Sequence, residues 1–115
     1  MTGRPRRWQG GGMEPDTTTL NAEQVAQEQL AGWTYDTSGE ADSIVARVET
    51  GDFVTGLALV NAIGAKAEEA NHHPDIDLRY PYVEIRLTSH DAGGVTSRDI
   101  AMAKVINGLS AESSL

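Results

Sequence analysis

The three histidines of this chain lie in one short stretch of the sequence, together with acidic side chains. His72 and His73 are adjacent, His90 follows 17 residues later, and Glu68 and Asp99 flank the group. Histidine is the side chain that titrates nearest to neutrality, so it can both give and take a proton at working pH. Imidazoles with neighbouring carboxylates are typical of acid–base catalysis or of a metal site.

The spacing of these residues is more specific than their types. Glu68 is followed by three residues, the sequence His-His-Pro, five residues, a tyrosine, nine residues, a histidine, eight residues and an aspartate. This pattern resembles the signature of the pterin-4a-carbinolamine dehydratases. Its seven specified positions are Glu68, His72, His73, Pro74, Tyr80, His90 and Asp99. The resemblance covers about residues 20–109, and the half that holds the motif is the more specific.

The resemblance implies an enzyme that removes water from 4a-hydroxytetrahydropterin, a carbinolamine, to give a quinonoid dihydropterin for tetrahydrobiopterin recycling. His72 and His90 would transfer protons, and His73 would bind the substrate or share that role. Glu68 would hold the His72 ring in one tautomer. No metal or organic cofactor is expected, because the pterin itself is the substrate. A homodimer or homotetramer is expected from the same resemblance.

Pro74, Ile76 and Tyr80 are the residues that we expect to contact the pterin. Ile76 stands where animal members of the family commonly carry a tryptophan, whose indole could wall a planar pterin more effectively. His-Pro-Asp-Ile-Asp sequences look like those of bacterial members, so we interpret Ile76 as variation that affects substrate affinity. Tyr80 has an alternative explanation as an aromatic residue of a sheet.

Other motif residues also have structural explanations. Glu68 and His72 lie four apart on a predicted helix, as an exposed surface pair would. His90 precedes a glycine loop and could be a surface turn residue. Thr96 and Asp99 have the form of a capping box at the start of a helix. The joint spacing favours a shared site, and for Asp99 we expect a mixed role in capping and in orienting His90 or the substrate.

Three other functions remain open at this stage. Glu68, His72 and His90 could bind zinc, although no fourth ligand is evident. The family also includes a dimerisation cofactor of a homeodomain transcription factor, and dehydratase-like proteins assemble Rubisco. In those assembly proteins the motif is typically degraded, so the intact motif here favours the enzyme. The protein could also bind pterin without turnover.

Composition sets limits on the partners and on the location of the protein. The formal net charge of −8 argues against direct nucleic-acid binding, because phosphate contacts need clustered basic side chains. The chain has no cysteine, which excludes disulfides and cysteine-based metal sites. No run approaches the roughly 20 apolar residues that span a bilayer, and no apolar segment follows the N-terminal arginines. A soluble cytoplasmic protein without membrane contact is the expectation.

One domain is predicted over residues 20–115, after a disordered tail over 1–19 that is rich in glycine and poor in apolar side chains. Met13 is an alternative start. Helices are predicted for 23–30, 53–70 and from residue 97 on, and strands for 33–35, 43–49, 76–79 and 83–87. This α-β-β-α-β-β-α order predicts an α+β fold, with a four-stranded antiparallel sheet and helices on one face.

Residue spacing also predicts which side chains face the core. Val83, Ile85 and Leu87 alternate with polar residues, as in a strand with one buried face. The helical stripe expected over 53–70 consists of Phe53, Leu57, Val60, Ile63 and Ala67. Gly56 and Gly64 could permit close packing of this helix on the sheet, and Gly32 is expected to end the first helix. The last helix is expected to turn Ile100, Ala103, Val105 and Ile106 inward.

Overall fold

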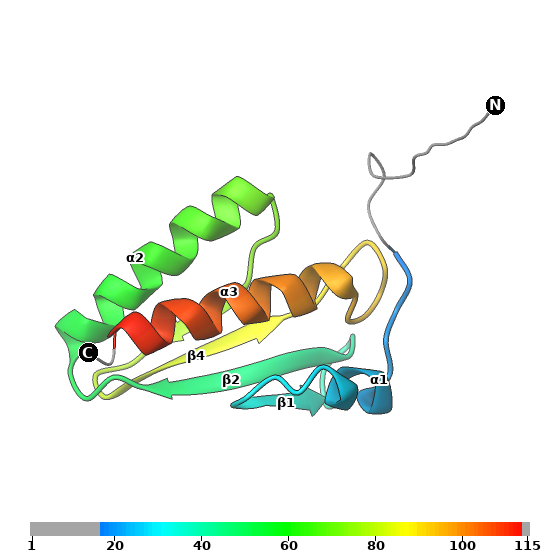
Figure 1. Ribbon diagram of the computed structural model, residues 1–115, viewed down its shortest axis with the longest axis horizontal. Helices are drawn as coiled ribbons and strands as arrows, with labels where there is room; N and C mark the ends of the chain where they lie inside the picture. Colours follow the sequence, from blue (N-terminus) through cyan, green and yellow to red (C-terminus); the bar gives the residue numbers. More distant parts are fainter. Residues whose placement is uncertain (1–16, 114–115) are drawn as a thin grey trace.

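The structure, a computed structural model, describes residues 17–113. Its elements are α1 (Ala22–Gln27), β1 (Trp33–Asp36), β2 (Ser43–Glu49), α2 (Phe53–Ala70), β3 (Asp75–Leu78), β4 (Tyr82–Leu87) and α3 (Ser97–Ser113) (Figure 1). The strands form one antiparallel sheet in the order β1-β2-β4-β3. The predicted fold class and element order are confirmed. The disorder predicted for residues 1–19 lies mostly outside the described residues.

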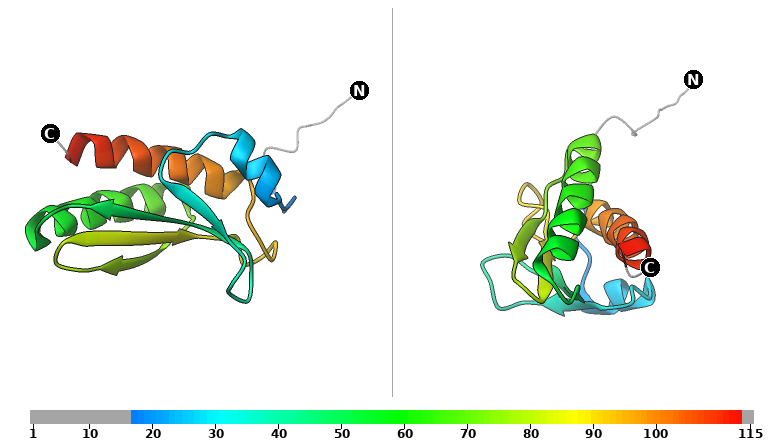
Figure 2. Two further views of the ribbon diagram at one scale, coloured as in Figure 1. Left: turned by 90° about the horizontal axis from the view of Figure 1, so that it is seen from below. Right: turned by 90° about the vertical axis from the view of Figure 1, so that its left-hand side faces the viewer.

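Side chains of the central strands alternate between a covered and an open face of the sheet. Ile44 and Ala46 on β2, and Val83, Ile85 and Leu87 on β4, are buried. Figure 2 shows α2 and α3 together on one side of the sheet, and these strand residues form the core with buried residues of the two helices. The period-2 pattern predicted for β4 is therefore confirmed. Among residues 17–113, no helix combines the length and apolarity that a membrane span requires.

The inner face of α2 differs from the predicted stripe. Phe53 and Leu57 were expected in the core, but they are 45% and 41% exposed. Gly56, Leu59 and Ile63 face the sheet instead and are buried. A Cβ added at Gly56 would lie 2.8 Å from Leu78 Cδ1 and 3.3 Å from Val83 Cγ2. The helix thus turns its smallest residue to the sheet, which lets its backbone approach β3 and β4 closely.

The two glycines inside α2 should respond in opposite ways to alanine. Nothing lies within 4 Å of a Cβ at Gly64, so Gly64→Ala should raise the free energy of unfolding by up to about 1 kcal/mol through helix propensity. Gly56→Ala should forfeit that gain, because overpacking typically costs about 1–3 kcal/mol. Urea unfolding of both variants measures the difference, and equal stabilities would contradict the close packing at Gly56.

The first helix is shorter than predicted. It begins as expected at Asn21, whose side chain accepts from the Gln24 backbone N–H in a capping box, but it ends at Gln27 rather than near Leu30. Gln29 takes a left-handed conformation, with φ of 56°, directly after the helix. Gly32 also has a positive φ, but it belongs to the turn before β1. The prediction that Gly32 ends this helix is therefore wrong.

The loop between β1 and β2 is tied to β4 through Arg86. Its guanidinium donates to Asp36 at 2.7 Å and to the Ser43 hydroxyl at 2.6 Å. The backbone N–H of Ser38 also donates to Asp36. The Ser38 hydrogen bonds and the Arg86 guanidinium lower the pKa of Asp36 to about 2.

A lowered pKa makes the contribution of Asp36 to stability depend on pH. The contribution is complete above the ordinary pKa value of 3.8 and is lost as the pH falls towards about 2. Asp36→Asn should therefore be less stable than the unchanged protein at neutral pH, and the difference should shrink between about pH 4 and pH 2. Urea unfolding at a series of pH values measures it. A difference that stays constant over this range would show that the charge of Asp36 is not responsible.

Candidate active site

The end of α2 sets the position of the adjacent histidines. Asn71 takes a left-handed conformation with φ of 51° and ends the helix. The backbone N–H of His72 donates to the carbonyl of Ala67, which closes the helix end. His72 thus leaves the helical face on which it would lie four residues after Glu68.

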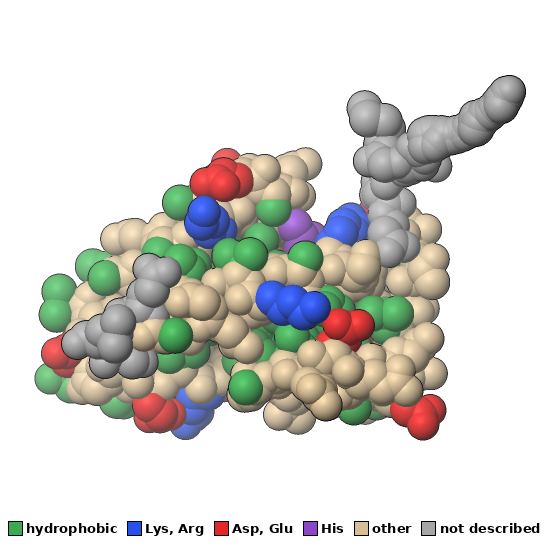
Figure 3. Space-filling model, viewed as in Figure 1, with side chains coloured by type: hydrophobic (Ala, Val, Ile, Leu, Met, Phe, Trp, Pro, Cys, Tyr) green, Lys and Arg blue, Asp and Glu red, His purple; other side chains and the backbone are tan. Residues whose placement is uncertain are grey.

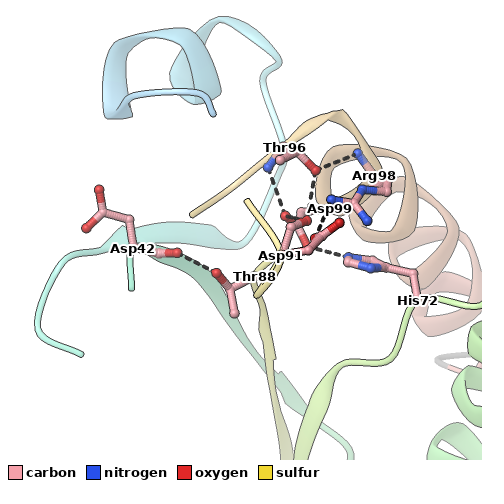
Figure 4. A network of polar contacts seen from close by, with 8 residues as sticks. Asp42, His72, Thr88, Asp91, Thr96, Arg98 and Asp99 are labelled. Atoms are coloured by element: carbon pink, nitrogen blue, oxygen red, sulfur yellow. Dashed lines mark hydrogen bonds and ion pairs between the residues drawn. The ribbon is translucent and has the colours of Figure 1, made fainter. Parts of the chain in front are cut away.

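The His72 ring contacts Asp99, at the opposite side of the domain's sequence. Nε2 of His72 lies 2.5 Å from Oδ1 of Asp99 (Figure 4). The side chain of Asp99 is fully buried and that of His72 is 11% exposed. An ion or hydrogen-bond pair this well shielded from water is stronger than one on the surface.

The second carboxylate oxygen of Asp99 accepts two hydrogen bonds. The Ser89 hydroxyl donates to Oδ2 at 2.8 Å, and the Thr96 backbone N–H donates to the same atom at 2.9 Å. The Thr96 contact is the predicted helix cap, since Asp99 lies in the first turn of α3. The mixed role expected for Asp99 is confirmed as far as the contacts show, but the histidine that it orients is His72 rather than His90.

This arrangement determines the tautomer of His72. A carboxylate can only accept hydrogen bonds, so Nε2 of His72 carries the proton that faces Asp99. Nδ1 is left as the ring nitrogen that can take a proton from another group or return one to it. The site therefore contains an acid–base group whose orientation and tautomer are both fixed.

A cleft between α2 and α3 opens beside His72. Its volume is about 440 Å³, within the range usual for small-molecule sites. Its lining is Lys66, Glu69 and Ala70 from α2, Arg98, Ala101, Met102 and Val105 from α3, and His72. Figure 3 shows a histidine in the hollow between these helices, with basic side chains on either side. Val105, expected in the core, is 39% exposed at this cleft.

Arg98 is held at the cleft by an acidic partner from the loop after β4. Its Nη2 donates to Oδ1 of Asp91 at 2.7 Å. This hydrogen bond, opposed by a smaller burial effect, lowers the pKa of the Asp91 carboxyl. The pair keeps a cation near the histidine side of the cleft at neutral pH.

Glu68 contacts a different histidine from the one predicted. Its Oε2 lies 2.5 Å from Nε2 of His73, and the two side chains are 77% and 54% exposed. The prediction that Glu68 holds the His72 ring is wrong, because α2 ends before His72 and the chain turns at Asn71. Glu68 and His73 form a solvated pair next to the buried pair of His72 and Asp99.

The remaining motif residues are spread more widely. His90 is exposed after β4 and lines another cavity, of about 280 Å³, with residues that include Asp75, Arg86 and Thr88. His73 and Pro74 precede β3, whereas Tyr80 follows it and is 65% exposed. Ile76 lies within β3 and packs against the core. The structure thus brings Asp99 to His72 and Glu68 to His73, and it places Tyr80 beyond the other end of β3.

Within residues 17–113, no three histidine, aspartate or glutamate side chains gather closely enough to hold a metal ion. Glu68, His72 and His90, considered above as zinc ligands, are therefore not grouped as such a site requires.

Ser89 is a site residue that the sequence analysis missed. It continues the alternation of Val83, Ile85 and Leu87, which predicts that its side chain points into the core, where it is only 1% exposed. A buried hydroxyl needs a hydrogen-bond partner, so a serine at this position of the pattern was a usable signal.

Comparisons with known proteins agree with the motif. The family model for pterin 4 alpha carbinolamine dehydratase matches residues 18–109. A protein of Acidobacterium capsulatum, provisionally named as a dehydratase of this kind, is 50% identical over 70 residues, which are 61% of this chain and 76% of that protein. One of Nocardia farcinica with the same provisional name is 42% identical over 95 residues, 81% of this chain and 96% of its own.

Two solved structures resemble the fold. A transcriptional coactivator/pterin dehydratase from Brucella melitensis has a TM-score of 0.73 and 27% identity, over 81% of this chain and 99% of that one. A pterin dehydratase-like RuBisCO assembly factor of the alpha-carboxysome has a TM-score of 0.58 and 24% identity, over 69% and 89% of the two chains. The second likeness concerns the fold alone. With a family model that matches most of its length and relatives that share its motif half, this chain belongs to the pterin-4a-carbinolamine dehydratase family.

Proposed function

We propose that the protein is an enzyme that dehydrates 4a-hydroxytetrahydropterin to quinonoid dihydropterin, in the recycling of tetrahydrobiopterin. The observation that carries this proposal is the pair of His72 and Asp99 at the cleft between α2 and α3. It supplies an imidazole with a fixed tautomer beside a space large enough for a small ligand. Family membership supplies the substrate class.

The reaction needs only proton transfer. The 4a-hydroxyl takes up a proton and leaves as water, and the neighbouring ring nitrogen gives up its proton. The electron pair of the broken N–H bond then forms the carbon–nitrogen double bond of the product. One proton is gained and one is lost, so no redox cofactor is needed, and none is proposed. Acid–base catalysis by a positioned side chain contributes about 10²–10⁴ in rate.

We assign the principal acid–base role to His72, through Nδ1, because Asp99 holds its other nitrogen. His90 is proposed as the second proton-transfer group, and His73, paired with Glu68, as a binding or orienting group. The roles of His73 and His90 rest on the signature spacing. The apolar Ala70, Ala101 and Met102 would contact the flat faces of the pterin in the cleft, and basic side chains would face its polar edge.

The direct test is the decay of 4a-hydroxytetrahydropterin, generated by a hydroxylase and followed by absorbance, with and without the purified protein. We expect the protein to accelerate the decay in proportion to its concentration. Protein carrying His72→Ala is the matched control for binding without catalysis. An unchanged decay rate with folded protein would overturn the proposal.

A second candidate function is a role in protein assembly, and exposed apolar side chains favour it. Phe53, Val54 and Leu57 on α2 are 45%, 69% and 41% exposed. Solved relatives carry the titles of a coactivator and an assembly factor. The same surface would serve a homodimer or homotetramer, which we also propose. Val54→Ser should weaken association in sedimentation experiments and leave dehydration intact if the two functions are separate.

A further inference from the structure

The hydroxyl groups of Ser89 and Thr96 form a chain that ends on Asp99. Ser89 Oγ lies 2.8 Å from Oδ2 of Asp99 and 2.8 Å from Oγ1 of Thr96. All three side chains are buried, with exposures of 1%, 0% and 0%. Shielded from water, each hydroxyl has only these protein groups to satisfy it.

The direction of this chain follows from counting protons. Asp99, as a carboxylate, can only accept, so the single hydroxyl proton of Ser89 is donated to Oδ2. Ser89 has no second proton for Thr96, so the Thr96 hydroxyl donates to Ser89. Thr96 Oγ1 in turn accepts from the backbone N–H of Arg98, at 3.3 Å, in the first turn of α3. Every donor in the chain therefore points towards Asp99.

We propose that Ser89 is a positioning residue for His72 and acts through Asp99. With the Ser89 hydroxyl and the Thr96 backbone N–H both on Oδ2, Oδ1 is reserved for the Nε2 proton of His72. The carboxylate then cannot rotate without breaking buried hydrogen bonds, so the ring keeps one orientation. Nδ1 of His72 stays directed away from Asp99 as the atom that exchanges a proton. The catalytic part of this inference rests on the proposed function, but the geometric part does not.

The test uses a series at position 89 in which the hydrogen-bond donor weakens. Cysteine is close to serine in size and is a weak donor, and alanine donates nothing. The probe is the proton NMR resonance of the His72 Nε2–H, assigned by its loss in His72→Ala. Because a carboxylate with fewer donors attracts the remaining proton more strongly, the resonance should move downfield from the unchanged protein to Ser89→Cys and further to Ser89→Ala. Turnover should fall in the same order, to about one tenth in Ser89→Ala, with KM within twofold.

A neighbouring hydroxyl provides the matched control. Thr88 donates to the carbonyl of Asp42 at 2.7 Å and makes no hydrogen bond to Asp99 among the described contacts (Figure 4). Thr88→Val should leave the His72 resonance in place. The inference is overturned if the resonance does not move across the Ser89 series, if Thr88→Val moves it equally, or if Ser89→Ala changes KM alone. Ser89→Cys preserves packing, so the series still decides the question if Ser89→Ala does not fold. If the unchanged protein has no dehydratase activity, the proposed function fails while the resonance series still decides whether Ser89 positions His72.

Discussion

Replacing both His72 and His90 with alanine should lower the kcat of dehydration by at least about 10²-fold while the domain remains folded. His72 lies beside the cleft with its tautomer fixed, and His90 is the second proposed proton-transfer group. Of the single variants, His72→Ala should cost more, because His72 alone has a buried carboxylate partner. The measurement is steady-state kinetics with generated 4a-hydroxytetrahydropterin.

Stability must be followed in the same variants. His72→Ala leaves Oδ1 of the buried Asp99 without its partner, which should cost about 1–3 kcal/mol of unfolding free energy. Circular dichroism and urea unfolding show whether the loss of activity comes from unfolded protein. Tyr80→Ala, an exposed motif residue beyond the far end of β3, is a useful comparison, because its effect on kcat should be small. Near-normal turnover in a folded double variant would remove the proposed acid–base mechanism.

Asp99→Asn should lower kcat by about 10²–10⁴-fold, with a much smaller effect on folding. The amide oxygen can still accept from Ser89 and from the Thr96 backbone N–H, so the amide nitrogen must face His72. Nε2 of His72 then becomes the acceptor and its proton moves to Nδ1. The histidine is held in the wrong tautomer to take a proton from the substrate.

Two measurements separate this effect from a loss of the helix cap. Nitrogen NMR of the histidine ring should show a proton on Nε2 in the unchanged protein and on Nδ1 in Asp99→Asn. The unfolding free energy should fall by only about 1–3 kcal/mol, the cost of one buried unpaired N–H and of a lost charge near a helix N-terminus. Unchanged kinetics with lower stability would mean that Asp99 serves only as a cap.

Most of the fold could be predicted from the sequence, because local signals agree with the tertiary structure. The ends predicted for β2 and α2 match the structure, and the alternation in β4 identifies its buried face. The face of α2 was predicted wrongly because large apolar residues outweigh a glycine in any periodic pattern. Only the sheet itself reveals that the helix approaches through Gly56.

The candidate site was predicted in its members more than in its pairings. Spacing on a helix linked Glu68 to His72, but a left-handed residue at position 71 cannot be recognised from that spacing. The contact between His72 and Asp99 joins residues 27 positions apart and depends on how α3 packs beside α2. Such a pairing is a product of tertiary packing, so sequence alone could indicate Asp99 but not its partner.

The turn at Asn71 gives two neighbouring histidines entirely different surroundings. One pair, His72 with Asp99, is shielded from solvent, and the other, His73 with Glu68, is largely immersed in it. Mobile ions screen exposed charges beyond about 8 Å at physiological ionic strength but act far less on buried ones. Ionic strength therefore distinguishes the two imidazoles without any mutation: added salt weakens the attraction between His73 and Glu68 and leaves that between His72 and Asp99 in place.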